Sequence, residues 1–215
     1  MSAQDPHRAQ PVLSYGAPLE GARAAMVMLH GRGASARDIL GIADVLGRTD
    51  YAYLAPDAAG GTWYPYSFLS PIEQNEPWLS SALACVARVV DAVQRAGVPA
   101  ERTMLLGFSQ GACLTLEFTA RNARRYGGVA ALTGGLIGPD GTPRDYAGSL
   151  DGTPIFIGSS DPDPHIPIAR VHESARVLTT MGAVVTTRIY PGMGHTVNED
   201  EIGNVRALME GVLAS

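Results

Sequence analysis

The sequence has few of the features that mark disulfide-stabilised or membrane proteins. Only two cysteines, Cys85 and Cys113, occur in 215 residues. Both lie in segments of helical spacing, which favours buried free thiols over a disulfide or a metal site. No apolar run approaches the roughly 20 residues needed to cross a bilayer. Residues 1–10 are polar and lack the apolar core of a secretory signal. We therefore predict a cytoplasmic protein without membrane insertion, in which residues 1–10 are disordered.

Basic clusters, internal repeats and low-complexity segments are also absent. The chain has 16 Lys and Arg residues against 21 Asp and Glu residues, and its formal net charge is −5. This balance argues against nucleic acid or an anionic membrane surface as a partner. Hydrophobic residues make up 46% of the chain. That fraction is enough, at this length, for one domain with a full core, which we predict over residues 11–215.

Short apolar runs alternate with amphipathic segments along the chain. Continuous apolar runs are typical of strands buried on both faces of a parallel sheet. The pattern predicts strands over residues 24–29, 51–55, 103–108, 129–132, 154–157 and 184–190, with an edge strand over 12–15. It predicts helices over residues 38–46, 76–96, 112–122, 171–180 and 201–213. This order predicts an α/β protein with a mostly parallel, doubly wound sheet of six to seven strands.

The pentapeptide Gly107-Phe108-Ser109-Gln110-Gly111 has the form G-x-S-x-G, between a predicted strand and a predicted helix. At such a strand-to-helix turn the serine hydroxyl projects above the sheet edge, where it can act as a nucleophile. The backbone N–H of Gln110 points into the same space and can stabilise an oxyanion. The alternative is a glycine-rich turn in which Ser109 only caps the helix.

Other reactive side chains also follow predicted strands. Asp161 and Asp163 come after the strand over residues 154–157, and His195 follows the last strand. The carboxyl ends of parallel strands meet at one edge of the sheet. The chain order of serine, acid and histidine is that of α/β hydrolases, in which the histidine acts as base and the acid orients it. The residue types leave Asp161 and Asp163 open as the acid, because either could cap a turn.

Two further segments could complete a site around Ser109. The stretch His30-Gly31-Arg32-Gly33 follows the strand over residues 24–29, and the backbone N–H of Arg32 is a candidate second oxyanion donor. We interpret His30 as a structural histidine. The long segment over residues 57–77 is rich in aromatic residues, and we expect Trp63 and Tyr64 to line an apolar substrate pocket. The alternative is that these aromatics only cover the core.

Four motifs together resemble the phospholipase/carboxylesterase family of α/β hydrolases, which includes small carboxylesterases and acyl-protein thioesterases. They are Leu29-His30-Gly31, Gly107-Phe108-Ser109-Gln110-Gly111, Asp163-Pro164-His165-Ile166-Pro167 and Tyr190-Pro191-Gly192-Met193-Gly194-His195. The resemblance runs from about residue 24 to near the C-terminus. It implies an α/β-hydrolase fold without a large cap domain, and it favours Asp163 as the acid beside Ser109 and His195. It also implies oxyanion donors at Arg32 and Gln110. We expect no cofactor and no metal.

Two departures from the family pattern bear on the substrate. The family usually has an apolar residue at the position of Arg32, whose positive charge could favour an anionic substrate. Trp63 matches a tryptophan common in the family, but residues 64–68 do not follow the usual acyl-protein thioesterase pattern. We therefore expect a serine carboxylesterase that acts on small or medium esters, with acyl thioesterase or lysophospholipase activity as the alternative. An exposed aromatic segment would also be a candidate homodimer contact.

Two non-hydrolase functions remain as alternatives. Gly31-x-Gly33-x-x-Ala36 follows a strand and begins a helix, with Asp50 or Asp57 about 20 residues on, as in dinucleotide-binding proteins. That hypothesis gives no role to the serine turn or to His195, so we favour the hydrolase interpretation over it. A non-catalytic ligand receptor on a hydrolase fold is the second alternative, because fold alone does not fix function.

Overall fold

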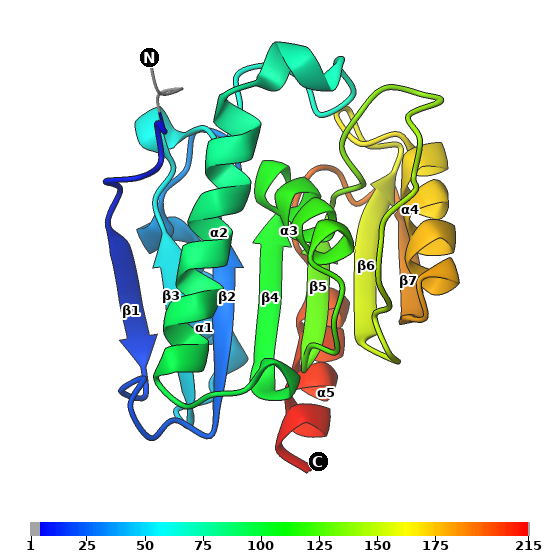
Figure 1. The fold of residues 1–215 in the computed structure, drawn as a ribbon. Coiled ribbons are helices and arrows are strands. Elements are labelled where there is room, and N and C mark those ends of the chain that lie inside the picture. Colours follow the sequence, from blue (N-terminus) through cyan, green and yellow to red (C-terminus); the bar gives the residue numbers. More distant parts are fainter. Residues whose placement is uncertain (1–4, 215) are drawn as a thin grey trace.

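The computed structural model describes residues 5–214, which form seven strands and five α-helices (Figure 1). The strands are β1 (Val12–Gly16), β2 (Ala24–Leu29), β3 (Tyr51–Pro56), β4 (Thr103–Phe108), β5 (Gly128–Leu132), β6 (Pro154–Asp161) and β7 (Val184–Pro191). The helices are α1 (Ala36–Leu46), α2 (Trp78–Arg95), α3 (Gln110–Arg121), α4 (Ile168–Thr180) and α5 (Glu199–Ala214). Short 3₁₀ turns are η1 (Ala59–Gly61), η2 (Ile72–Asn75) and η3 (Ala100–Arg102).

All seven strands join one sheet in the order β1-β3-β2-β4-β5-β6-β7. The pairs from β3 to β7 are parallel, and only β1 runs antiparallel, along the outer edge of β3. This arrangement confirms the predicted α/β-hydrolase fold with a mostly parallel sheet. The predicted edge strand is also present. All parallel strands end at the same edge, so the segments that follow β2, β4, β6 and β7 meet there.

Helices cover both faces of the sheet, with α2, α3 and α4 on one face and α1 and α5 on the other (Figure 1). Alternate residues of β2 show why its apolar run is continuous. Val27 and Leu29 pack in the core beneath α2 and α3, whereas Met26 and Met28 pack beneath α1 and α5. Successive side chains of a strand point to opposite faces, so a strand covered on both faces needs apolar residues throughout.

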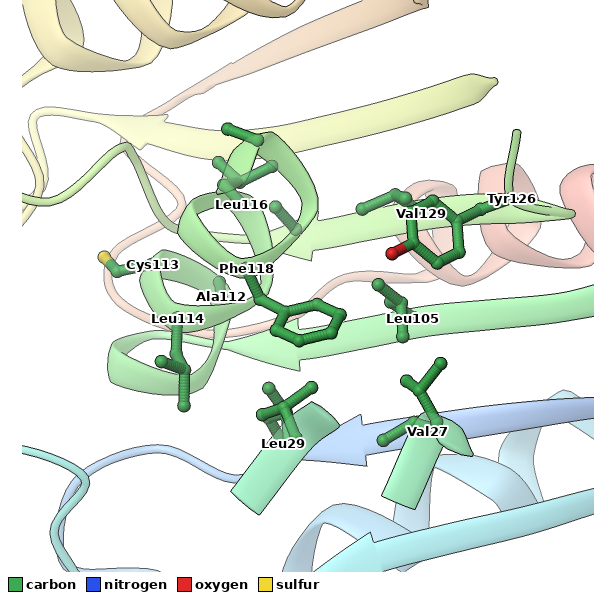
Figure 2. Close-up of a cluster of buried hydrophobic side chains, with 14 of the residues drawn as sticks. Val27, Leu29, Leu105, Ala112, Cys113, Leu114, Leu116, Phe118, Tyr126 and Val129 are labelled. Carbon is green, nitrogen blue, oxygen red and sulfur yellow. The ribbon is translucent and has the colours of Figure 1, made fainter. Parts of the chain in front are cut away.

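Helix α3 lies across the centre of the sheet (Figure 2). Phe118 and Leu114 of this helix pack with Leu29, Leu105 and other apolar side chains of β2, β4 and β5. All of these side chains are fully or almost fully removed from solvent. The tight packing fixes the axis of α3 and therefore the position of its first turn above the end of β4.

The N-terminal segment differs from its prediction. Residues 1–4 lie outside the described residues, but His7 is fully buried. Its backbone N–H donates to Ser81 Oγ at 2.9 Å, and its ring packs against Trp63 and Trp78. The prediction of disorder therefore does not hold from Asp5 onward. The polar composition of this segment did not predict the contact, because a single buried ring holds an otherwise polar segment in place.

The segment over residues 133–153, which connects β5 to β6, forms no cap domain over the site. Two buried charged side chains hold it against the helices. Arg170 donates to the carbonyl oxygen of Leu136 at 2.9 Å, and Glu117 accepts from the backbone N–H of Ile137 at 3.1 Å. These contacts satisfy charges that would be unfavourable if buried alone, and they keep the segment close to the core.

The structure agrees with the expectation of buried free thiols. Cys85 and Cys113 are both buried and unpaired. In the part of the chain from residue 5 to 214, no helix combines the length and apolarity needed to span a membrane.

Candidate active site

Ser109 lies at the turn between β4 and α3 with φ 55° and ψ −119°. A positive φ is uncommon for a residue with a side chain and is often found where function requires it. The flanking glycines make the turn possible. A Cβ atom at Gly107 would lie 2.3 Å from the carbonyl oxygen of Gly111, and one at Gly111 would lie 2.1 Å from that of Leu29. The sharp turn lifts the Ser109 hydroxyl above the end of β4.

His195 joins Ser109 to Asp163. The Nε2 atom of His195 lies 2.8 Å from Ser109 Oγ, and its Nδ1 atom lies 2.9 Å from Asp163 Oδ2. The other carboxylate oxygen of Asp163 accepts from the backbone N–H groups of His165 and Ile166 at 2.8 and 2.9 Å. A serine, an imidazole and a carboxylate thus form one hydrogen-bonded chain across three connecting segments.

The hydrogen bonds around Asp163 favour its ionised form. Burial acts to raise the pKa of this carboxyl, but hydrogen bonds from the His165 N–H, the His195 ring and the Ile166 N–H outweigh burial and hold the pKa below its usual value. An ionised carboxylate keeps the proton of His195 on Nδ1, which leaves Nε2 free to accept from the serine hydroxyl. The neighbouring Asp161 is exposed and makes no hydrogen bond to this imidazole.

Two rings flank the imidazole of His195. The Phe108 ring centroid lies 5.3 Å away, and the His165 ring meets it edge to face at 4.8 Å. Close aromatic neighbours restrict rotation of the imidazole about its side-chain bonds. The ring therefore has little freedom to leave the line between Ser109 and Asp163.

A cavity of about 490 Å³ opens beside Ser109 and His195. Most of its wall is apolar, and it includes Tyr64, Phe68 and Ile166. Residues of the segment after β2 and of the first turn of α3 complete the wall. This combination of an apolar wall with a few convergent polar groups is typical of small-molecule sites.

The two candidate oxyanion donors lie on this wall. Arg32 and Gln110 both line the cavity together with Ser109. Within residues 5–214 the backbone N–H groups of Arg32 and Gln110 make no hydrogen bond to protein. Gln110 is the first residue of α3, where the backbone N–H groups have no acceptor inside the helix. Both N–H groups are therefore available to a ligand oxygen.

The family assignment follows from comparison of the whole chain. A sequence model of the family described as Phospholipase/Carboxylesterase matches residues 16–212. This chain belongs to that family. The match covers nearly all described residues, and it confirms the resemblance inferred from the four motifs.

Solved structures and sequence relatives agree with this family. The crystal structure of a phospholipase/carboxylesterase from Dyadobacter fermentans superimposes with a TM-score of 0.91 at 48% identity, covering 94% of this chain and 97% of that one. Acyl-protein thioesterase 1 of Saccharomyces cerevisiae is 26% identical over 226 residues, 94% of this chain and 99% of that protein. Acyl-protein thioesterase 1 of Gibberella zeae is 32% identical over 116 residues, 53% of this chain and 49% of that protein. The chain thus spans about half the length of the first curated relatives it matches.

Within this family member, Trp63 has a different position from the one predicted. Its side chain is fully buried and lies outside the cavity wall. Its Nε1–H donates to the carbonyl oxygen of His30 at 2.9 Å, and the two rings are 5.0 Å apart. The prediction that Trp63 binds substrate is therefore wrong, because the buried ring offers no surface to a ligand. It supports the segment that carries Arg32 instead.

His30 has the structural role that was predicted for it. Its Nε2 accepts from the backbone N–H of Ala58 at 3.0 Å, and its Nδ1 lies 2.8 Å from the carbonyl oxygen of Gly31. Burial lowers the pKa of this imidazole. The neutral ring therefore has both nitrogens in use within the protein, away from Ser109.

The side chain of Arg32 contacts the aromatic segment. Its guanidinium donates to Thr62 Oγ1 at 3.0 Å and to the carbonyl oxygens of Pro65 and Tyr66 at 2.8 and 2.7 Å. The sequence predicted a positive charge beside the site. The structure shows in addition that the guanidinium already makes three hydrogen bonds to the protein. The acceptors are neutral carbonyl and hydroxyl groups, and no carboxylate of residues 5–214 forms an ion pair with this guanidinium.

Sequence reasoning gave Gln110 a backbone role only and missed its side chain. Its Oε1 accepts from the backbone N–H of Trp63 at 3.0 Å, and its Nε2 donates to the carbonyl oxygen of Tyr64 at 2.8 Å. A side-chain amide buried in a tight turn needs hydrogen-bond partners, and the position of Gln110 directly before Gly111 was the available signal. The side chain fixes the aromatic segment to the Ser109 turn.

The two acidic residues considered for dinucleotide binding, Asp50 and Asp57, have other partners in the fold. Asp57 Oδ1 accepts from the backbone N–H of Ala36 at 2.6 Å, which caps the start of α1. Asp50 forms an ion pair with Arg48 at 2.9 Å. Both carboxylates thus have partners within the protein, and the family assignment excludes the Rossmann interpretation. Across residues 5–214, no group of three or more His, Cys, Asp or Glu side chains is arranged to hold a metal.

Proposed function

We propose that this family member is a serine carboxylesterase that hydrolyses small or medium carboxylic esters through an acyl-enzyme intermediate. The observation that carries the proposal is the continuous chain from Ser109 Oγ through His195 to Asp163, with separations of 2.8 and 2.9 Å. Its serine end opens into an apolar cavity. Membership of a hydrolase family supports an ester substrate.

The first half of the reaction forms the acyl-enzyme. His195 Nε2 takes the proton of Ser109 as the serine oxygen attacks the ester carbonyl carbon. The carbonyl oxygen becomes an oxyanion, which the backbone N–H groups of Arg32 and Gln110 stabilise. The bond to the alcohol then breaks, and the His195 imidazolium gives its proton to the departing alkoxide.

The second half releases the acid. Water gives a proton to His195 Nε2 and attacks the acyl carbon, and the second tetrahedral intermediate uses the same two N–H donors. Collapse returns the proton from His195 to Ser109 Oγ and frees the carboxylic acid. Asp163 stabilises the imidazolium in both halves while it remains ionised.

The cavity wall supports substrates with an apolar group next to the ester. Tyr64 is almost fully buried and faces the cavity, together with Phe68 and Ile166. Burial of apolar surface stabilises binding by about 25 cal/mol for each Å². A cavity of about 490 Å³ suits small or medium groups, so we propose that Tyr64 contacts substrate there.

Acyl thioester hydrolysis is the second candidate. Three sequence relatives carry the name acyl-protein thioesterase 1. The same nucleophile, base and oxyanion donors would serve a thioester, since only the leaving group differs. Matched oxygen and thioester substrates with one acyl group would separate these activities.

A fluorophosphonate probe tests the nucleophile directly. We expect the intact protein to become labelled at Ser109, and Ser109→Ala to remain unlabelled. Peptide mass spectrometry would locate the adduct, and p-nitrophenyl esters of increasing acyl length would measure activity. An intact protein that neither reacts with the probe nor hydrolyses any ester would contradict the esterase proposal. Labelling that survives Ser109→Ala would exclude Ser109 as nucleophile.

A further inference from the structure

Ser160 connects two segments that carry candidate catalytic residues. It lies near the end of β6 and is fully buried. Its Oγ accepts from the backbone N–H of Gly194 at 2.9 Å. The same Oγ lies 3.1 Å from the carbonyl oxygen of Pro162, to which its hydroxyl can donate. Gly194 directly precedes His195, and Pro162 directly precedes Asp163. One hydroxyl thus contacts the backbone beside both residues.

The segment that carries His195 needs such a constraint. Gly192 and Gly194 have φ values of 68° and 81°, in the region that glycine adopts without strain. Glycine also gives the backbone many alternative conformations. Ser160 lies within 3.3 Å of the carbonyl oxygen of Tyr190 as well, at the end of β7. Its hydroxyl therefore has one acceptor on the segment that follows β6 and one at the end of β7.

We propose that Ser160 is a positioning residue that aligns the His195 ring with Asp163 and Ser109. The proposal rests on the function proposed above, because it assigns His195 the part of the base. Ser160 fixes the amide before His195 and the carbonyl before Asp163 at a common point. Without the hydroxyl, the β6–β7 pairing and the bond from the Gly192 N–H to the carbonyl oxygen of Asp161 still join the two segments, but the amide before His195 loses its acceptor. A small shift of this amide then moves the imidazole off its line to Ser109.

The neighbouring Ser159 provides a matched control. Side chains alternate between the two faces of a strand. Phe156 packs in the core beneath α1 and α5, and Ile157 packs in the core on the other face. Ser160 thus shares a face with Phe156, and Ser159 lies on the opposite face. Ser159 is also fully buried, and its Oγ has no hydrogen-bond partner among residues 5–214.

The experiment compares Ser160→Ala with Ser159→Ala in the full-length protein. A displacement of about 1 Å can lower a rate by about 100-fold. We expect Ser160→Ala to lower kcat by about 10- to 100-fold and the fluorophosphonate labelling rate by a similar factor. KM should change by less than about twofold, because Ser160 does not line the cavity. Ser159→Ala should match the parent protein in kcat and labelling rate.

Two further measurements separate positioning from general stability. The proton on His195 Nδ1 should give a low-field proton NMR signal, which Ser160→Ala should broaden or shift and Ser159→Ala should not. Ser160→Cys keeps one heavy atom beyond Cβ, although sulfur is larger than oxygen, and it gives only a weak donor and acceptor. It should therefore have a kcat between those of the parent and Ser160→Ala, whether or not Ser160→Ala is less stable.

Three outcomes would overturn the positioning role while the parent protein remains active. The first is an unchanged kcat and NMR signal in Ser160→Ala. The second is a rise in KM at constant kcat, which would indicate a binding effect. The third is an equal loss in Ser159→Ala, which would indicate general damage to β6. A parent protein with no esterase or probe reactivity would instead contradict the proposed function itself.

Discussion

The side-chain amide of Gln110 donates to the carbonyl oxygen of Tyr64 at 2.8 Å. This bond joins the turn that holds Ser109 to the segment that lines the cavity. Arg32 reaches the same segment from the other side, through the carbonyl oxygens of Pro65 and Tyr66. The two residues proposed as oxyanion donors thus hold the cavity wall with their side chains. These hydrogen bonds would hold the cavity wall at a constant distance and orientation relative to the two backbone N–H groups.

Arg32→Ala should lower kcat/KM for a neutral ester by about tenfold. Hydrogen bonds contribute about 1 kcal/mol each, and a loss of about 1.4 kcal/mol corresponds to a factor of ten. We expect the same factor for an ester of equal size that carries a carboxylate, because the guanidinium acts on the protein segment. A much larger loss for the charged ester would instead show that Arg32 binds an anion. Arg37→Ala, which removes an exposed charge on α1, is the control.

Asp163→Asn should lower kcat by about 10³- to 10⁴-fold, by analogy with the loss of the triad acid in serine proteases. The amide cannot stabilise the imidazolium and favours the wrong tautomer of His195. Asp161→Asn should stay within about twofold of the parent, because the exposed Asp161 makes no bond to the imidazole. Steady-state kinetics on one ester would compare them. The reverse order would reassign the acid to Asp161.

Glu201→Gln should stabilise the protein at alkaline pH. Burial of Glu201 near Gly158 raises the pKa of its carboxyl to about 7, although a hydrogen bond from Asn198 opposes the shift. Because this pKa lies above the unfolded value of 4.5, the favourable contribution is complete below about 4.5 and is lost as the pH rises through about 7.

Urea denaturation at pH of about 5 and about 8 would measure the effect. The variant should be more stable than the parent at the higher pH, by at most about 3 kcal/mol, since one pKa unit corresponds to about 1.4 kcal/mol. The difference should shrink at the lower pH. A difference that is equal at both values would show that Glu201 titrates normally in the folded protein.

His7→Phe should weaken the N-terminal contact and change its pH dependence. His7 Nδ1 accepts from the backbone N–H of Ala59 at 3.0 Å, and its Nε2 lies 3.0 Å from the carbonyl oxygen of Trp63, so the bound ring is neutral. Burial lowers the pKa of His7 below its usual 6.5. Protonation therefore favours the unfolded chain, and this contribution to stability is lost as the pH falls below about 6.5.

The variant keeps aromatic packing against the tryptophans but leaves two backbone groups unpaired. We expect a loss of about 1 to 3 kcal/mol at neutral pH, the usual effect of unsatisfied buried polar groups. The stability of the variant should also fall less than that of the parent between pH of about 6.5 and about 5. Equal pH profiles in urea denaturation would show that His7 does not titrate on unfolding. Arg8→Ala, at an exposed neighbour, is the control.

The sequence alone predicted the elements and their order. Apolar runs identified the buried strands because a parallel strand covered on both faces must be apolar throughout. Boundaries were less accurate. Strand β6 continues to Asp161, beyond its predicted end at residue 157, because it pairs with β7 as far as Pro191. Such pairing depends on a neighbour far away in the chain, which a local pattern does not contain.

For the site, the sequence by itself determined the reactive residue types and the edge of the sheet where they meet. Ser109 and His195 follow from a turn motif and from strand ends. Tertiary structure decided how side chains are used. It brought Asp163, and not Asp161, to the imidazole, and it buried Trp63 beneath the His30 segment.

The connection made by Ser160 also appeared only in three dimensions, because its partner Gly194 is 34 residues away in the chain. Strand and helix patterns reflect local geometry, which repeats along the chain. The direction of a loop side chain depends on long-range hydrogen bonds and packing. The sequence therefore determined which groups could react, whereas only the folded structure decided which of them touch.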